Sequence, residues 1–190
     1  GKALAELAED GVNETAVDAI RLLALTGCRR GEIVGLCWEW VDWDRACIRF
    51  PDSKTGAKAV PLGAPALALL EGRQPEGGAV GPVFPGSGKA GTTTALWQAW
   101  DKARDRANLP GVRIHDLRHS FASVGAASGD SLVVIGALLG HHGAGDHRAL
   151  GHAAGLQREQ VFGRQQQRRV GRERGRCRTG ATAGRAAARQ

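Results

Sequence analysis

The chain has 190 residues, a length that suits one hydrophobic core followed by a tail, and 42% of its residues are hydrophobic. No apolar run approaches the roughly 20 residues that cross a bilayer, so no membrane-spanning helix is expected. The formal net charge of +7 is concentrated at one end, because residues 1–145 carry 15 basic and 16 acidic side chains whereas residues 146–190 carry 11 arginines and 3 acids.

Hydrophobic periodicity predicts three helices in the first part of the chain, over residues 2–8, 15–26 and 30–37. In the second of these helices, four apolar residues fall at helical spacing, namely Val17, Ile20, Leu23 and Ala24. Gly27 follows directly after the last apolar positions, and we expect it to end that helix.

A β-hairpin is predicted after these helices. Residues 46–50 alternate in the manner of a strand, and residues 57–62 form the expected partner strand, joined to the first through residues 52–56. The segment 77–91 is rich in glycine and proline and is expected to be a loop, with a short third strand at residues 80–84.

Further helices are predicted over residues 64–70, 93–108, 116–127 and 131–139. From Gly143 onward the periodicity is lost and large apolar side chains are few, so this part cannot bury enough surface to offset its ordering entropy. We therefore expect a mainly α fold with a small antiparallel β-sheet at about residues 41–62 (α+β). Residues 1–145 would form this domain, and residues 146–190 would form a disordered Arg/Gly/Gln-rich tail.

The cysteines are Cys28, Cys37, Cys47 and Cys177. No two of them lie two to four residues apart, which argues against a zinc knuckle or a redox pair. They are typical of reduced thiols, and the N-terminal residues lack the basic-then-apolar pattern of a signal peptide. These features predict a cytoplasmic protein.

Three polar clusters are candidate functional motifs. TGCRRGE at residues 26–32 spans a helix junction, and SKTG at 53–56 lies at the tip of the predicted hairpin. HDLRHS at 115–120 begins a helix, where His115 and Arg118 are expected to share a face at i and i+3. Each motif alone is weak evidence, because an arginine near a helix start is most often a solvated surface residue.

Together and in this order, the motifs resemble those of the tyrosine recombinase (phage integrase) family. The catalytic domain of that family carries TGxRxxE, a hairpin lysine, HxLRH and LGH. Here these motifs are residues 26–32, Lys54, residues 115–119 and residues 139–141. The stretches LCWEWVDWD and VPL, on either side of the hairpin, fit the same pattern. The resemblance covers about residues 1–145.

The resemblance implies site-specific DNA recombination or integration, by strand cleavage and rejoining through phosphoryl transfer. Guanidinium groups can grip the oxygens of a phosphate bidentately. The implied ligands of the scissile phosphate are Arg29, Arg118, His115 and His141. Lys54 would protonate the 5′-hydroxyl leaving group, and Glu32 would orient Arg29 rather than react. Cationic side chains supply the charge stabilisation that Mg²⁺ gives in other enzymes, so neither a cofactor nor a metal is expected.

The histidine-rich stretch GHHGAGDHRALGH at residues 140–152 admits a second interpretation, a metal site. Such a site would require several histidines to converge on a Gly-rich loop with no acid other than Asp146. The histidines concerned are His141, His142, His147 and His152. The resemblance instead assigns His141 to the LGH motif, and no metal site is expected.

The nucleophile of the family is a tyrosine, and these 190 residues contain none. At the family's usual spacing after the LGH histidine, the position is occupied by Leu150, which has no nucleophilic atom. The closing helix of the family is also unrecognisable. A frameshift is one hypothesis, because the codons of residues 146–149 shifted by one base can encode Thr-Thr-Glu-Arg or Thr-Thr-Ala-Arg, although a single slip supplies no tyrosine codon.

Three functions are compatible with these observations. The first is a degenerate or truncated recombinase catalytic domain, without the N-terminal core-binding domain and inactive for want of a tyrosine. The second is a non-catalytic DNA-binding protein that retains the fold, and the third is an RNA-binding protein that acts through the Arg-rich tail. The first two predict double-stranded DNA as the partner, in the bacterial cytoplasm or nucleoid and without a membrane. The homo-oligomer that the family forms on DNA is not expected without the closing helix.

Overall fold

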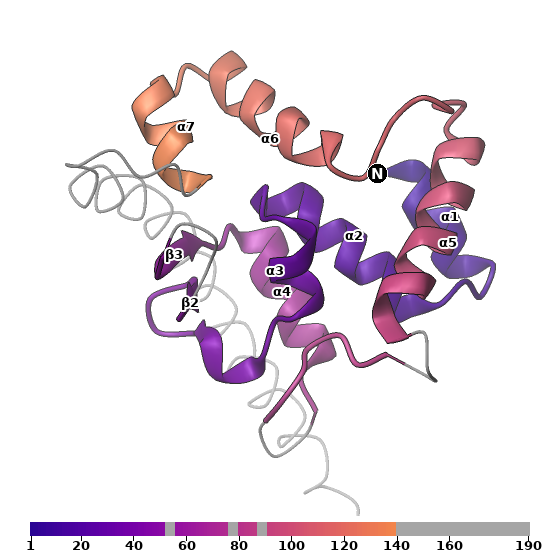
Figure 1. Cartoon of the computed structure of the whole chain (residues 1–190), viewed down its shortest axis with the longest axis horizontal. Helices are drawn as coiled ribbons and strands as arrows, with labels where there is room; N and C mark the ends of the chain where they lie inside the picture. The colour runs from indigo at the N-terminus through magenta and orange to yellow at the C-terminus, as the bar shows by residue number, and fades with distance from the viewer. Residues whose placement is uncertain (52–55, 76–79, 87–90, 140–190) are drawn as a thin grey trace, which may run out of the picture.

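The computed structural model describes residues 1–51, 56–75, 80–86 and 91–139 (Figure 1). It shows the predicted fold, which is mainly helical with one small antiparallel sheet. The helices are α1 (Lys2–Glu9), α2 (Glu14–Thr26), α3 (Arg30–Val34), α4 (Ala64–Arg73), α5 (Gly91–Arg106), α6 (Asp116–Ala127) and α7 (Leu132–Leu138), with a 3-10 helix η1 (Trp38–Trp40). The strands are β1 (Val41–Asp42), β2 (Cys47–Phe50) and β3 (Lys58–Pro61). The predicted tail lies outside the described residues.

Helix α2 is the centre of the fold. It contacts α1, α3, α4, α5 and α6, and Figure 1 shows α1 and α5 at the right of the view and α6 and α7 at the upper left. Asn13 caps its start, because the side-chain Oδ1 accepts a hydrogen bond from the backbone N–H of Ala16 at 2.9 Å. No helix of the described ranges has the length and apolar character needed to cross a membrane.

The predicted apolar stripe of α2 is largely confirmed. Val17, Ile20 and Leu23 are buried in the core, as their helical spacing indicates. Ala24 is exposed, contrary to the prediction, because its side of the helix faces a pocket between α2 and α4 rather than the core.

Gly27 ends α2 in the left-handed conformation, with a φ angle of 63°. A Cβ atom at this position would lie 2.7 Å from Cδ1 of Phe121 on α6 and 2.9 Å from Cδ2 of Leu139 after α7. Glycine is therefore required both by the backbone conformation and by the close approach of α6 and α7 to the end of α2.

Helix α3 is shorter than the predicted 30–37, because the chain after Val34 bonds to a different segment. The Leu36 carbonyl accepts the N–H of Val83 at 2.8 Å, and the Trp38 N–H donates to the Gly81 carbonyl at 2.9 Å. These bonds replace the i to i+4 bonds that a longer helix would have made.

The sheet has three antiparallel strands in the order β1–β2–β3, with Phe50 opposite Lys58. The predicted hairpin and its extent at about residues 41–62 are confirmed. The expected third strand at residues 80–84 is wrong, because β1 is the third strand and Pro82 forms only an isolated bridge with Cys37. Proline has no N–H to donate, so the ladder does not extend along this segment.

Candidate active site

The first motif lies at the junction of α2 and α3. Arg29 is the N-cap residue of α3, and the Glu32 carboxylate accepts its backbone N–H through Oε2 at 2.8 Å. Oε1 of the same carboxylate accepts Nη1 of Arg29 at 3.1 Å. The Arg29 side chain is 26% exposed and that of Glu32 is 10% exposed. The carboxylate therefore fixes an arginine whose guanidinium still reaches solvent, a geometry that supports the orienting role expected for Glu32.

Arg118 points into the protein from the first half of α6. Its Nη1 donates to the carbonyl of Gly27 at 2.6 Å, and its Nη2 donates to the carbonyl of Leu139 at 2.5 Å. The residue is 7% exposed. One guanidinium thus bridges the end of α2 to the end of α7, and it brings the HDLRHS motif against the TGCRRGE motif across 91 positions of sequence.

The hydrogen bond to Gly27 brings Arg118 to the α2–α3 junction, where the charges of Arg29 and Glu32 act on it. Burial lowers the pKa of Arg118, and the positive charge of Arg29 lowers it further. Cys28 lies among these groups: burial raises the pKa of its thiol to about 11, and Glu32, Arg118 and Lys58 all act on its charge. Arg118 therefore reaches the junction that carries Arg29, and the joint binding of one phosphate by the two arginines stays a prediction.

His115 directly precedes α6 and is exposed. Its ring meets that of His119 edge to face, with 5.3 Å between the centroids. His115 is exposed whereas Arg118 is buried against the two carbonyls, and the expectation that the two side chains share a face stays a prediction. The start of α6 is held by Asp116, which accepts hydrogen bonds from the backbone and side chain of Arg113.

Lys54, His141 and Leu150 lie outside the described residues, and their expected places in the site stay predictions. The residues on either side of Lys54 are described: Phe50 ends β2 and Lys58 begins β3. Leu139, two residues before His141, accepts the hydrogen bond from Arg118.

Lys58 is a residue of the cluster that the motifs did not indicate. Its Nζ donates to Oε2 of Glu32 at 2.7 Å, and its side chain is only 2% exposed. Strand alternation offered a signal, since Lys58, Val60 and Leu62 occupy alternate positions and all three are buried. A lysine on the inward face of a strand requires an acidic partner, because an unpaired buried charge is costly.

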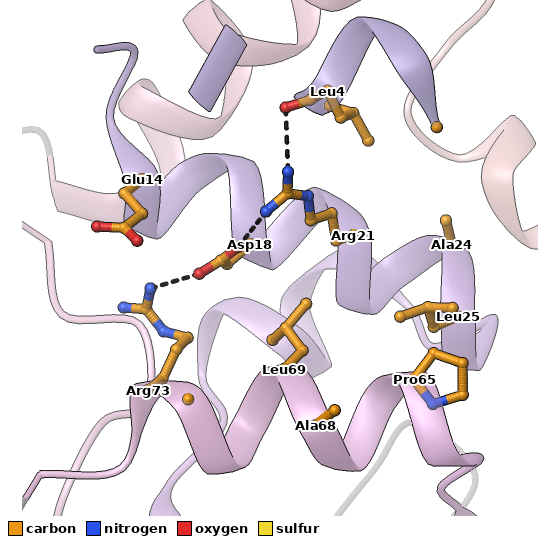
Figure 2. Close-up of a pocket in the computed structure, with 12 residues that line it drawn as sticks. Leu4, Glu14, Asp18, Arg21, Ala24, Leu25, Pro65, Ala68, Leu69 and Arg73 are labelled. Carbon is orange, nitrogen blue, oxygen red and sulfur yellow. Dashed lines mark hydrogen bonds and ion pairs between the residues drawn. The ribbon is translucent and has the colours of Figure 1, made fainter. Parts of the chain in front are cut away.

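A separate pocket of about 620 Å³ lies between α1, α2 and α4 (Figure 2). Asp18 is its main polar group, and Figure 2 shows Arg21 and Arg73 reaching it, at 3.0 and 2.9 Å. None of the residues predicted for the site lines this pocket. With its carboxylate held by two arginines, Asp18 serves to join α2 to α4.

The cluster around Cys28 is cationic and suited to an anion with several oxygens. Arg29, Arg118 and Lys58 carry three positive charges, and Glu32 carries one negative charge. Guanidinium groups recognise phosphate oxygens with fixed geometry. Among the residues that the structure describes, no three His, Cys, Asp or Glu side chains lie together in a way that could hold a metal ion.

Sequence comparison assigns the chain to a known family. A profile of the phage integrase family matches residues 2–145. The chain belongs to this family, whose members are tyrosine recombinases. The mainly helical fold, its small antiparallel sheet and the order of the motifs all agree with this assignment.

Individual relatives support the same conclusion. Prophage integrase IntF of Escherichia coli (strain K12) is 29% identical over 133 residues, 68% of this chain and 28% of that protein. Tyrosine recombinase XerC of Xylella fastidiosa (strain M23) is 32% identical over 126 residues, 64% of this chain and 43% of that protein. The chain thus spans less than half the length of these relatives.

Solved structures share the fold. The XerH site-specific recombinase, in a pre-cleavage complex with difH substrate, superposes with a TM-score of 0.59 at 21% identity, over 80% of this chain and 49% of that chain. The XerA recombinase superposes with a TM-score of 0.57 at 21% identity, over 82% of this chain and 60% of that chain.

Proposed function

We propose that residues 1–145 form the catalytic domain of a site-specific tyrosine recombinase, which binds double-stranded DNA and holds a backbone phosphate at the Arg29–Arg118 cluster. The observation that carries this proposal is the hydrogen bond from Nη1 of Arg118 to the carbonyl of Gly27, which brings Arg118 to the junction that carries Arg29 and its partner Glu32. The DNA partner is supported by the solved relatives, among them XerH bound to difH substrate and the Tn1549 transposon integrase in complex with circular intermediate DNA.

The reaction of the family at such a site is phosphoryl transfer, in which a tyrosine oxygen bonds to phosphorus as the bond to the 5′-oxygen breaks. Negative charge develops on the non-bridging oxygens in the transition state, and preorganised cations stabilise it without reorganising at the moment of reaction. In this proposal Arg29 and Arg118 bind those oxygens, and His115 and His141 donate further hydrogen bonds. Lys54 transfers its proton to the 5′-oxygen as the phosphorus–oxygen bond breaks.

The attacking oxygen of the family is missing from this chain. With no tyrosine among the 190 residues and Leu150 at the expected position, the chain has no side chain for a covalent 3′-phosphotyrosyl link. We therefore propose a degenerate copy that retains phosphate binding and has lost cleavage. The lack of a tyrosine among these residues also favours the alternative function. That alternative is a non-catalytic DNA-binding protein that acts in the cytoplasm or nucleoid without the oligomer of its family.

The first test compares DNA binding by two arginine variants. Arg29→Ala is expected to weaken binding of a fluorescein-labelled duplex, measured by anisotropy at fixed salt, because it removes a phosphate contact. Arg45→Ala is the matched control, since its side chain is 60% exposed and pairs with Asp42 on the sheet. Equal losses in the two variants would contradict a special role for Arg29.

The second test concerns cleavage. On a nicked suicide substrate the chain is expected to form no covalent adduct on a denaturing gel, and an adduct would contradict the proposed loss of cleavage. A chimera in which the closing segment of a XerC relative replaces the residues after 145 restores the tyrosine and the helix that aims it. This chimera is expected to form the adduct, and Arg29→Ala is expected to abolish it.

A further inference from the structure

Lys58 is a buried cation with a single acidic partner, Glu32, in the part of the chain that the structure describes. It begins β3, and its Nζ lies 2.7 Å from Oε2 of Glu32 and 5.2 Å from the centroid of the Phe50 ring. Its side chain is 2% exposed, and Phe50 is equally enclosed. A group so placed cannot reach a DNA oxygen outside the domain. Lys58 is therefore not a second candidate for the proton-donating role proposed for Lys54.

Lys58 can influence Arg29 because both residues share the carboxylate of Glu32. Oε2 of Glu32 accepts Lys58 and the backbone N–H of Arg29, while Oε1 accepts Nη1 of Arg29. Burial alone would raise the pKa of Glu32, but the hydrogen bonds from Lys58 and Arg29 outweigh it, and the pKa lies below its ordinary value. Glu32 is thus an ionised carboxylate shared between two cations.

A charge balance follows from this arrangement. Arg29 and Glu32 alone form a neutral pair, and a phosphate approaching a neutral pair gains little from Arg29 because the carboxylate repels it. Adding Lys58 gives the three groups a net charge of +1 at a site where water is largely excluded and charges interact strongly. The carboxylate still holds Arg29 in place, but its charge is balanced from the interior.

We infer that Lys58 is a positioning residue of the phosphate site: it neutralises Glu32 from the buried side, so that Glu32 can orient Arg29 without cancelling its attraction for a phosphate. This inference rests on the proposed function, because it presupposes that Arg29 binds a phosphate. A purely structural Lys58 would only join β3 to α3, and its loss would change stability alone.

The test uses the full chain and inorganic phosphate as the probe. The Nε–H resonance of Arg29, assigned through its absence in Arg29→Lys, is followed by NMR during a phosphate titration. Variants are Lys58→Met, Glu32→Gln and the double variant, with Lys102→Met as control. Lys102 is exposed on α5, so its replacement removes the same charge far from the cluster. The free energy of unfolding is measured for each variant.

Lys58→Met is expected to weaken phosphate binding at Arg29 about tenfold, because the remaining pair is neutral. Glu32→Gln is expected to bind at least as tightly as the unchanged chain. The double variant restores a net charge of +1 and is expected to bind within about threefold of it. If Lys58→Met does not fold, the double variant decides, because it leaves neither an unpaired buried carboxylate nor an unpaired buried cation.

Two outcomes would overturn the inference, and a third would overturn the proposed function. Unchanged phosphate binding in folded Lys58→Met would show that Lys58 has only a structural role. A double variant that binds phosphate as weakly as folded Lys58→Met would show the same. A double variant that binds more than about threefold weaker than the unchanged chain would likewise refute the charge balance. No response of Arg29 to phosphate in the unchanged chain would instead contradict phosphate binding itself.

Discussion

Gly27 combines a positive φ angle of 63° with side chains packed where a Cβ atom would lie. Gly27→Ala is therefore expected to lower the free energy of unfolding by about 3 kcal/mol, as the sum of left-handed strain and overpacking. Urea denaturation measures this change. Gly11 is the matched control, because its φ angle is 72° but no atom lies within 4 Å of a built Cβ. Gly11→Ala is expected to cost only about 1 kcal/mol, and equal costs would contradict the packing argument.

The Cys28 thiol gives a second prediction for a single residue. Burial raises its pKa from 9.0 to about 11, so the folded chain keeps the proton at pH values where the unfolded chain releases it. The stability from this group is complete below pH 9 and is lost as the pH rises towards 11. Stability should fall by about 2 kcal/mol more over this range than in Cys28→Ala, in urea unfolding at several pH values. Parallel pH profiles for the two proteins would contradict it.

The ion pair of Lys58 could not be predicted from the sequence. Residues 57–62 were predicted as a strand, and the alternation along a strand puts Lys58 on the same side as Val60 and Leu62. Its partner was not visible, because Glu32 lies 26 positions earlier and meets Lys58 only after α3 packs beside the sheet. Arg29 and Arg118 were predicted from their motifs, but the inward turn of Arg118 towards two carbonyls was not.

Helix α7 is attached to the rest of the domain largely through α6 and Arg118. Arg118→Lys keeps the charge but loses the planar fork that reaches two carbonyls at once. We expect faster amide hydrogen exchange in α7 and at the end of α2, with little change in α1 and α5. The loss of the hydrogen bonds that join α7 to α2 should favour local opening of these two segments. Arg113→Lys is the control, since Arg113 is exposed and its one ion pair with the described residues is to nearby Asp116. Uniform exchange changes across all helices would contradict a local role.

Whole elements were predictable where local signals agreed with the tertiary packing. Helix α6 was predicted at residues 116–127, where the structure places it, and α7 begins after Ser131, whose hydroxyl accepts the N–H of Val134. The errors lie where distant segments compete for backbone bonds. Residues 36–38 leave the expected helix to pair with residues 81–83, and such a choice depends on contacts that periodicity does not contain.

The whole molecule divides its apolar core and its charge between different parts of the sequence. The main core cluster extends from Leu7 to Ile114, whereas 11 arginines and 3 acids lie in residues 146–190. Deleting residues 146–190 is therefore expected to leave the circular dichroism spectrum and the Tm unchanged within error. It should also reduce the affinity for duplex DNA and flatten its salt dependence, because fewer counterions are released. Loss of the cooperative thermal transition would show that the tail belongs to the fold.

The acceptors of Arg118 are main-chain oxygens, so its hydrogen bonds are less sensitive to mutation of the accepting residues. Every amino acid carries a carbonyl, so no substitution at position 139 can delete the acceptor that Leu139 provides. Side-chain partners such as Glu32 have no such protection, since one codon change removes them. In a gene lineage no longer selected for strand cleavage, the hydrogen bonds by which Arg118 joins α2 to α7 would therefore persist after the reactive side chains had been lost. A tyrosine can disappear from such a lineage long before the shape of its phosphate site does.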